Sequence, residues 1–191
     1  MHCAICVSKE CQQGMDCTDI RGDVMNVYRD RKNRKIIQVA SSIETEFHGK
    51  QNRLQELIFF CRRMGYRQLG IAFCIGLEEE ARILSEILEK RFTLSSVCCK
   101  VCGINRKAFD LPSLEEGRVE ATCNPIAQAR ILNRERTDLN IILGLCMGND
   151  ILFSKYSDAP VTTLVVKDRV LAHNPIGAIN VAHYRKDSWG V

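Results

Sequence analysis

Apolar residues follow two alternating patterns along this chain. Continuous apolar runs of strand length occur at 69–73, 93–101, 139–146 and 161–168. Apolar residues at helical spacing predict helices over 28–47, 52–64, 77–92 and 124–135, and a last short helix over 174–182. Strands that are apolar throughout are buried on both faces, as in a parallel sheet covered by helices. The pattern therefore predicts an α/β fold whose largely parallel sheet has about four to five strands with helices on both faces.

The first 19 residues follow neither pattern. They are polar and contain four cysteines, so they predict a loop-like head without a core of its own. A short polar stretch, 20–26, then leads to the first predicted helix. We expect two parts, a cysteine-rich metal-binding head over 1–19 and an α/β domain over 20–191.

Composition narrows the class of protein. Of the 191 residues 46% are hydrophobic but only 6% are aromatic, which predicts an aliphatic core. The net charge is +4, and the basic residues of "YRDRKNRKIIQ" and "CRRMGYRQ" fit a solvated helix face better than a surface for anionic partners. No motif that reads nucleic acid accompanies them, so we expect no nucleic-acid partner. Neither a signal peptide nor an apolar run of about 18 residues is present, and we expect no membrane association and a cytoplasmic location.

Eleven cysteines change this picture. In a reducing cytoplasm a disulfide framework is not expected, and an odd number of cysteines argues against one as well. The head carries them in the pattern C-x2-C-x4-C-x5-C, at Cys3, Cys6, Cys11 and Cys17. Four thiolates complete a tetrahedral shell for zinc or hold an iron–sulfur cluster. The spacing predicts a metal site in the head and leaves the metal open.

A second set of cysteines follows the predicted strands, except for Cys123, which stands just before the helix predicted from residue 124. In a parallel sheet the carboxyl ends of the strands share one edge, where ligands bind. The sequence predicts that a shared thiol site forms there from Cys74, Cys99, Cys102, Cys123 and Cys146. The Cys99-x-x-Cys102 pair can hold a metal or form a redox pair. Cys61 and Cys98 are expected to pack as small hydrophobic residues.

Two polar groups are further candidates for chemistry. Asp150 follows a strand in "GND" and opens a probable helix, where it can serve an anion site or only cap the helix. Asp168 and His173 follow the last strand, where they can act as acid or base or belong to an ordinary surface ion pair. P-loop, nucleophile-elbow and dinucleotide fingerprints are absent.

Four stretches carry a resemblance to a known family: "GIAFCIGLEEEA", "CNPIAQARILN", "TDLNIILGLCMGND" and "KYSDAPVTTLVVKDRVLAHNP". They resemble uncharacterised, cysteine-rich, predicted metal-binding proteins of anaerobic bacteria and methanogenic archaea, a domain of unknown function. The resemblance implies metal binding and no particular reaction. The positions that match are Cys3, Cys6, Cys11, Cys74, Cys99, Cys123, Cys146, Asp150 and Asn174. Relatives vary at Cys102 and commonly carry histidine at Asn149.

The leading hypothesis is a cytoplasmic protein that binds zinc or an iron–sulfur cluster through clustered cysteines, with a possible redox role and a possible redox partner protein. At the sheet edge Cys99, Cys123 and Cys146 would be joined by Cys102 or Cys74. One alternative is a metal-free enzyme with Cys123 as nucleophile, assisted by Asp168 or His173. Another is a metal-sensing or partner-docking module. Whether the protein is an enzyme, and its oligomeric state, stay open.

Overall fold

The computed structural model describes residues 1–112 and 119–189, and the chain forms two compact units, Met1–Lys50 and Gln51–Val191. The predicted boundary after residue 19 lies inside the first unit. Each unit is described by itself.

The first unit is helical. Two 3-10 turns, Cys3–Ile5 and Glu10–Gln13, precede α1 (Arg21–Val27) and α2 (Arg31–Phe47). The helix expected from residue 28 begins only at Arg31, because the Asp30 side chain accepts a hydrogen bond from the Asn33 amide and caps it. The stretch expected to be a polar link forms α1 instead.

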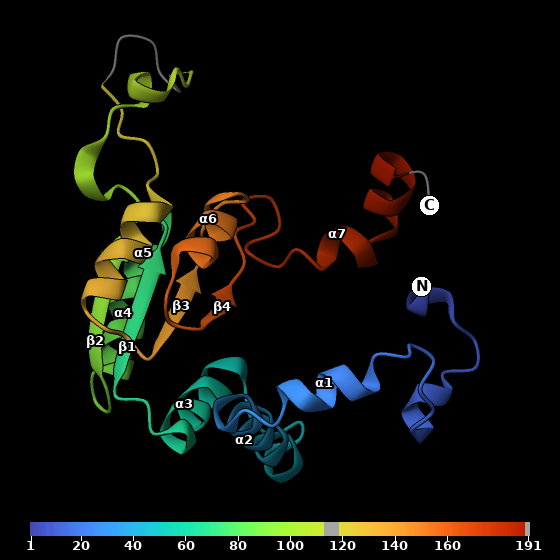
Figure 1. Ribbon diagram of the computed structural model, residues 1–191. Coiled ribbons are helices and arrows are strands. Elements are labelled where there is room, and N and C mark those ends of the chain that lie inside the picture. The colour runs from blue at the N-terminus through green and yellow to red at the C-terminus, as the bar shows by residue number, and fades with distance from the viewer. Residues whose placement is uncertain (113–118, 190–191) are drawn as a thin grey trace. The chain divides into compact units, whose positions relative to one another are not determined.

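The second unit is built on a four-stranded sheet (Figure 1). Its strands are β1 (Gln68–Phe73), β2 (Thr93–Cys98), β3 (Leu139–Leu143) and β4 (Val161–Val165). They lie in the order β2-β1-β3-β4, and every neighbouring pair is parallel. The predicted α/β fold with a parallel sheet is confirmed.

Helices cover both faces of this sheet. Their bounds are α3 (Arg53–Met64), α4 (Glu78–Leu88), α5 (Pro125–Arg134) and α6 (Asn149–Tyr156). A short helix, α7 (Gly177–Asn180), comes after β4 in the chain. Further 3-10 turns lie at Ile75–Leu77, Val101–Gly103 and Arg106–Phe109, and a π-helical turn at Tyr184–Trp189. Residues of α3 and α4 pack on one face, and residues of α5 and α6 on the other. Two of these helices begin at residues that favour a helix start. Asn52 and Gln55 form a capping box at α3, and Pro125 is the first residue of α5.

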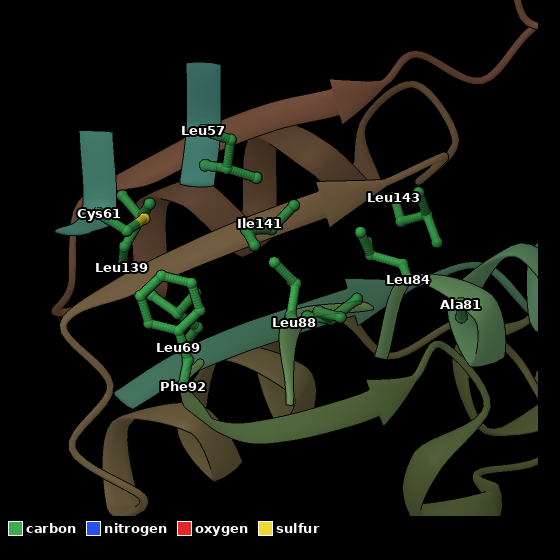
Figure 2. Packing of buried hydrophobic residues seen from close by; sticks show 11 residues of the cluster. Leu57, Cys61, Leu69, Ala81, Leu84, Leu88, Phe92, Leu139, Ile141 and Leu143 are labelled. Carbon is green, nitrogen blue, oxygen red and sulfur yellow. The ribbon is translucent and has the colours of Figure 1, made fainter. Parts of the chain in front are cut away.

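The core on the α3 and α4 face is aliphatic, as the composition predicts. Figure 2 shows Leu88 of α4 near Ile141 and Leu84 of α4 near Leu143, both on the central strand β3. Leu69, Leu88 and Ile141 are fully buried. Burial of one such side chain contributes about 1.5–3 kcal/mol, so this cluster is a main source of the unit's stability.

The strand order decides where a ligand can bind. The chain passes from β1 to β2 on one side, and from β3 to β4 on the other. The connections therefore diverge between β1 and β3, and in open parallel sheets ligands bind outside the carboxyl ends of the strands at such a point.

Candidate functional site at the carboxyl edge of the sheet

Four cysteines lie at the carboxyl edge of the sheet, and we call them the edge cysteines: Cys74, Cys99, Cys123 and Cys146. Cys74 directly follows β1, Cys146 comes after β3, and the Cys74 amide donates to the Leu143 carbonyl at 3.2 Å. Cys99 directly follows β2, and Cys123 lies two residues before α5. Cys74, Cys99 and Cys123 pack in the same cluster of residues. The fold thus brings into one cluster thiols that are up to 49 positions apart in the sequence.

Cys99 and Cys123 form the closest thiol pair of this set that the structure records. Their sulfur atoms are 3.9 Å apart. Cys99 is only 2% exposed, and the Ile75 amide donates to its sulfur at 3.4 Å. Cys123 is half-buried and is therefore the more exposed residue of the pair.

Backbone hydrogen bonds hold the two segments that carry this pair. The Asn124 amide donates to the Cys99 carbonyl at 2.8 Å, and the Thr122 amide donates to the Ile104 carbonyl at 2.7 Å. The Lys100 ammonium group donates to the Ala121 carbonyl at 2.7 Å. Since these bonds lie on both sides of Cys123, they fix the position of its Cα relative to Cys99.

The pair is electrostatically asymmetric. The hydrogen bond with Cys99, reinforced by the nearby Lys100 and Arg106 charges, lowers the pKa of Cys123 to about 6. The hydrogen bond with Cys123 and burial both raise the pKa of Cys99. When Cys123 ionises, the Cys99 thiol can donate to it, which stabilises one thiolate beside one thiol.

Cys146 has a cationic neighbour of its own. The Arg169 guanidinium donates to the Cys146 sulfur at 3.2 Å. This hydrogen bond and the charge of Cys146 raise the pKa of Arg169, and the charges of Cys74 and Cys123 act in the same direction. Arg169 therefore interacts electrostatically with three of the edge cysteines.

Lys167 supplies another positive charge at the same edge. Its ammonium nitrogen lies 3.4 Å from the place where a Cβ would stand on Gly76, and that place is 4.0 Å from the Cys74 sulfur. Gly144 has φ +65°, and a Cβ there would meet Leu77 at 2.1 Å. Because Gly76 and Gly144 have no side chain, the segments that follow β1 and β3 can lie close to the Lys167 side chain.

Gln128 is a residue that the sequence analysis missed. It is fully buried in α5, and its amide nitrogen donates to the carbonyls of Val97 at 2.7 Å and Phe73 at 3.2 Å. It ties the ends of β1 and β2 to the helix that follows Cys123. A glutamine on the inner side of an otherwise apolar helix, "PIAQARIL", was the available signal.

The structure also places the three remaining cysteines of this unit. Cys61 is buried among the residues of the α3 and α4 face, and burial raises its pKa to about 12. The Cys98 sulfur accepts a hydrogen bond from the Lys100 amide at 3.4 Å. Cys102 is exposed, with φ 69°. The structure thus gives Cys123, and not Cys102, as the sulfur neighbour of Cys99.

The head cysteines are arranged differently. Cys3, Cys6, Cys11 and Cys17 are all exposed. Hydrogen bonds from the Lys9 backbone and from Ser8 lower the pKa of Cys6. Across residues 1–112 and 119–189, no three His, Cys, Asp or Glu side chains form a ready metal-binding group. The metal assignments in the head and at the sheet edge remain predictions.

Comparison with known proteins places the chain in a family. Residues 11–164 match the model of a family described as "Protein of unknown function (DUF1847)". The chain belongs to the DUF1847 family. It is also 53% identical over 187 residues to the uncharacterized protein MJ0455 of Methanocaldococcus jannaschii, with 97% of each chain covered. No solved structure matches it. The expected relation to an uncharacterised family found in methanogenic archaea is confirmed.

The polar candidates of this DUF1847 chain make local contacts. The Asp150 carboxylate accepts from the amides of Gly148 and Ile151, so it closes the turn that opens α6. The Asp168 carboxylate accepts from the amides of Val170 and Leu171.

The His173 ring accepts a hydrogen bond from the Asp168 amide at 3.1 Å. These contacts shape the loop after β4, and a role for these residues as acid or base stays a prediction. Among the helices of the described residues, none is long and apolar enough to span a bilayer.

Proposed function

We propose that this protein binds a metal ion or an iron–sulfur cluster through thiolates at the carboxyl edge of its sheet. The observation that carries the proposal is the 3.9 Å separation of the Cys99 and Cys123 sulfurs. Two thiolates on one tetrahedral zinc ion, at a Zn–S distance of about 2.3 Å, stand about 3.8 Å apart. The pair therefore already has the spacing of two ligands on a single ion.

Cys74 and Cys146 are the proposed further ligands. Both follow central strands at the point where the connections diverge. The charge of Cys74 raises the pKa of Cys99. Arg169 contacts Cys146 and interacts electrostatically with Cys74 and Cys123. Binding a cation would draw these thiolates closer, because it removes the repulsion between their negative charges. Cys102 remains the alternative fourth ligand.

The positively charged side chains around the carboxyl edge of the sheet favour a metal–thiolate centre with a net negative charge. Lys100, Lys167 and Arg169 lie beside or in contact with the segments that carry the thiols. Four thiolates carry more negative charge than a zinc ion or a common cluster core offsets. Nearby cations reduce the cost of gathering such charge.

The head is the proposed second metal site, with Cys3, Cys6, Cys11 and Cys17 as ligands. Its support is the spacing of the cysteines together with their exposure, since four exposed thiols have no packing role. Binding free energy would organise a segment that has only two short 3-10 turns and no buried residue. Zinc would give the head a structure, whereas an iron–sulfur cluster would also exchange electrons with a partner protein.

The test is elemental analysis and visible spectroscopy of protein purified without oxygen. Thiolate-bound iron–sulfur centres colour the protein, and zinc leaves it colourless. We expect the double variant Cys99→Ser/Cys123→Ser to lose the edge metal and Cys6→Ser/Cys11→Ser to lose the head metal. Cys98→Ser, one position from Cys99, is the matched control and should retain both. Undiminished metal content in the first double variant would contradict the edge assignment, and metal-free wild-type protein would contradict both.

A further inference from the structure

The Cys99 and Cys123 pair is also arranged for chemistry that requires no metal. A disulfide has an S–S distance of about 2.05 Å, so each sulfur must move less than 1 Å from the observed 3.9 Å separation, about 1.9 Å in total. The backbone bonds from Asn124 to Cys99 and from Thr122 to Ile104 already fix the two segments side by side. Closing the bond therefore requires an approach of the two sulfurs by about 1.9 Å between segments that the backbone already holds together.

We propose that Cys123 and Cys99 carry out thiol–disulfide exchange with low-molecular-weight disulfides and end as a Cys99–Cys123 disulfide. The difference in exposure assigns the two roles. Cys123 is half-buried and can be reached by a small disulfide, whereas Cys99 is 2% exposed. Cys123 attacks the incoming disulfide, and the buried Cys99 then attacks the mixed disulfide that forms on Cys123.

The exchange balances in two steps. The Cys123 thiolate attacks one sulfur of RS–SR, the S–S bond breaks, and RS⁻ leaves as the Cys123–SR mixed disulfide forms. Cys99 then loses its proton to the departed thiolate or to water and attacks the Cys123 sulfur, which releases the second RS⁻. Two protein thiols are oxidised and one small disulfide is reduced to two thiols.

This pairing differs from the one that the sequence favours. The Cys99-x-x-Cys102 spacing resembles a redox motif, but Cys102 is exposed while Cys99 is buried. The sulfur contact that the structure gives Cys99 is with Cys123, 24 positions away. The inference does not depend on the metal proposal, although a disulfide at these two sulfurs would exclude a metal from them.

Oxidised glutathione is the probe, added to reduced, metal-depleted full-length protein. After an acid quench and alkylation of the remaining thiols, tryptic peptides are mapped by mass spectrometry. Trypsin places Cys123 in peptide 119–130, Cys102 in 101–106, and Cys98 with Cys99 in 92–100. We expect peptides 92–100 and 119–130 to be joined. The same link in Cys98→Ser assigns it to Cys99.

Three variants test the roles. Cys99→Ser should stop after the first step and accumulate glutathione on Cys123. Cys123→Ser should leave Cys99 unmodified, since the probe cannot reach it. Cys98→Ser, next to Cys99 in the chain, is the matched control and should form the disulfide at the wild-type rate. Circular dichroism checks that each variant is folded.

Two results would overturn the inference: a link between 92–100 and 101–106 in wild-type protein, or no link to 119–130 at all. Metal content is measured in a separate sample, so the two proposals fail separately. Metal binding without the disulfide rejects the exchange alone, and the disulfide without metal binding rejects the metal site alone.

Discussion

The head and the sheet edge each carry four cysteines, but the fold treats them in opposite ways. At the edge, Cys74 and Cys99 are buried and Cys123 and Cys146 are half-buried, all at positions fixed by strands or by a helix start. The head cysteines are exposed on a segment whose only regular structure is two 3-10 turns. The comparison teaches that strands and a helix start position the edge thiols, whereas the segment that carries the head thiols is ordered only by two 3-10 turns.

The largest difference should be in proteolysis. Lys9 lies in the exposed head, whereas Arg130 lies in α5, which must open before a protease can cleave it. We expect trypsin to cleave after Lys9 at least about a hundredfold faster than after Arg130, because opening of a packed helix is rare. Time-resolved mass spectrometry measures both rates. Added zinc should slow only the cleavage at Lys9. Equal cleavage rates at the two sites without metal would contradict the contrast between the head and the sheet edge.

A glycine substitution should separate the regions next. At Gly144 an alanine would have φ +65° and would meet Leu77 at 2.1 Å. We expect Gly144→Ala to lower the free energy of unfolding by about 2–4 kcal/mol, from backbone strain and overpacking together. Gly14→Ala is the matched control, since Gly14 also has a positive φ but nothing lies within 4 Å of its Cβ position.

Urea denaturation followed by circular dichroism measures both glycine variants. Gly14→Ala should leave the unfolding of the sheet unchanged. Equal losses of stability in the two variants would contradict the assignment of close packing to the sheet edge alone.

Single cysteine substitutions should show a smaller contrast. Cys99→Ser places a hydroxyl where a buried thiol packs, which we expect to cost about 1–3 kcal/mol of unfolding free energy. Cys11→Ser changes an exposed side chain and should stay within about 0.5 kcal/mol of wild type. Denaturation of metal-depleted protein gives both values. A larger loss for Cys11→Ser would show that the head thiols pack without metal.

The smallest effect should be electrostatic. Hydrogen bonding to Cys99, then the Lys100 charge, lowers the pKa of Cys123 to about 6, so the thiolate forms as pH rises through about 6. Lys100→Gln removes one favourable charge, which raises this pKa toward its ordinary value while the Cys99 contribution remains. We expect Cys123 alkylation in metal-depleted protein to slow about twofold to fivefold at pH 6 and little at pH 8.

Lys107→Gln, an exposed lysine in the same connection, is the control for this measurement. Its pH profile for iodoacetamide labelling of peptide 119–130 should match that of wild type. A profile unchanged by Lys100→Gln would remove Lys100 from the thiol site.

Prediction from sequence succeeded where the residues of one short segment are enough to determine its structure. The alternation of apolar strands with amphipathic helices is enough for a parallel sheet, and the helices predicted over 52–64 and 124–135 match α3 and α5 to within one residue at each end. It failed at residues 20–26, where α1 forms in a stretch expected to be a polar link. That stretch has a weak apolar pattern, so propensity alone did not distinguish a helix from a turn.

The thiol site shows the same limit. The rule that parallel strands end at one edge placed Cys74, Cys99, Cys123 and Cys146 together in advance. It could not rank Cys102 below Cys123 as the neighbour of Cys99. That ranking comes from hydrogen bonds between residues more than 15 positions apart, and no local spacing encodes them.

By itself, the sequence determined the class of fold, the aliphatic core and the edge of the sheet where the sulfur collects. These follow from side-chain periodicity and strand direction, which are properties of short segments. Only the tertiary structure decided the order β2-β1-β3-β4, the 3.9 Å contact of Cys99 with Cys123 and the burial of Gln128 in α5. Such features depend on how distant segments pack against one another, and packing is settled by the whole core at once.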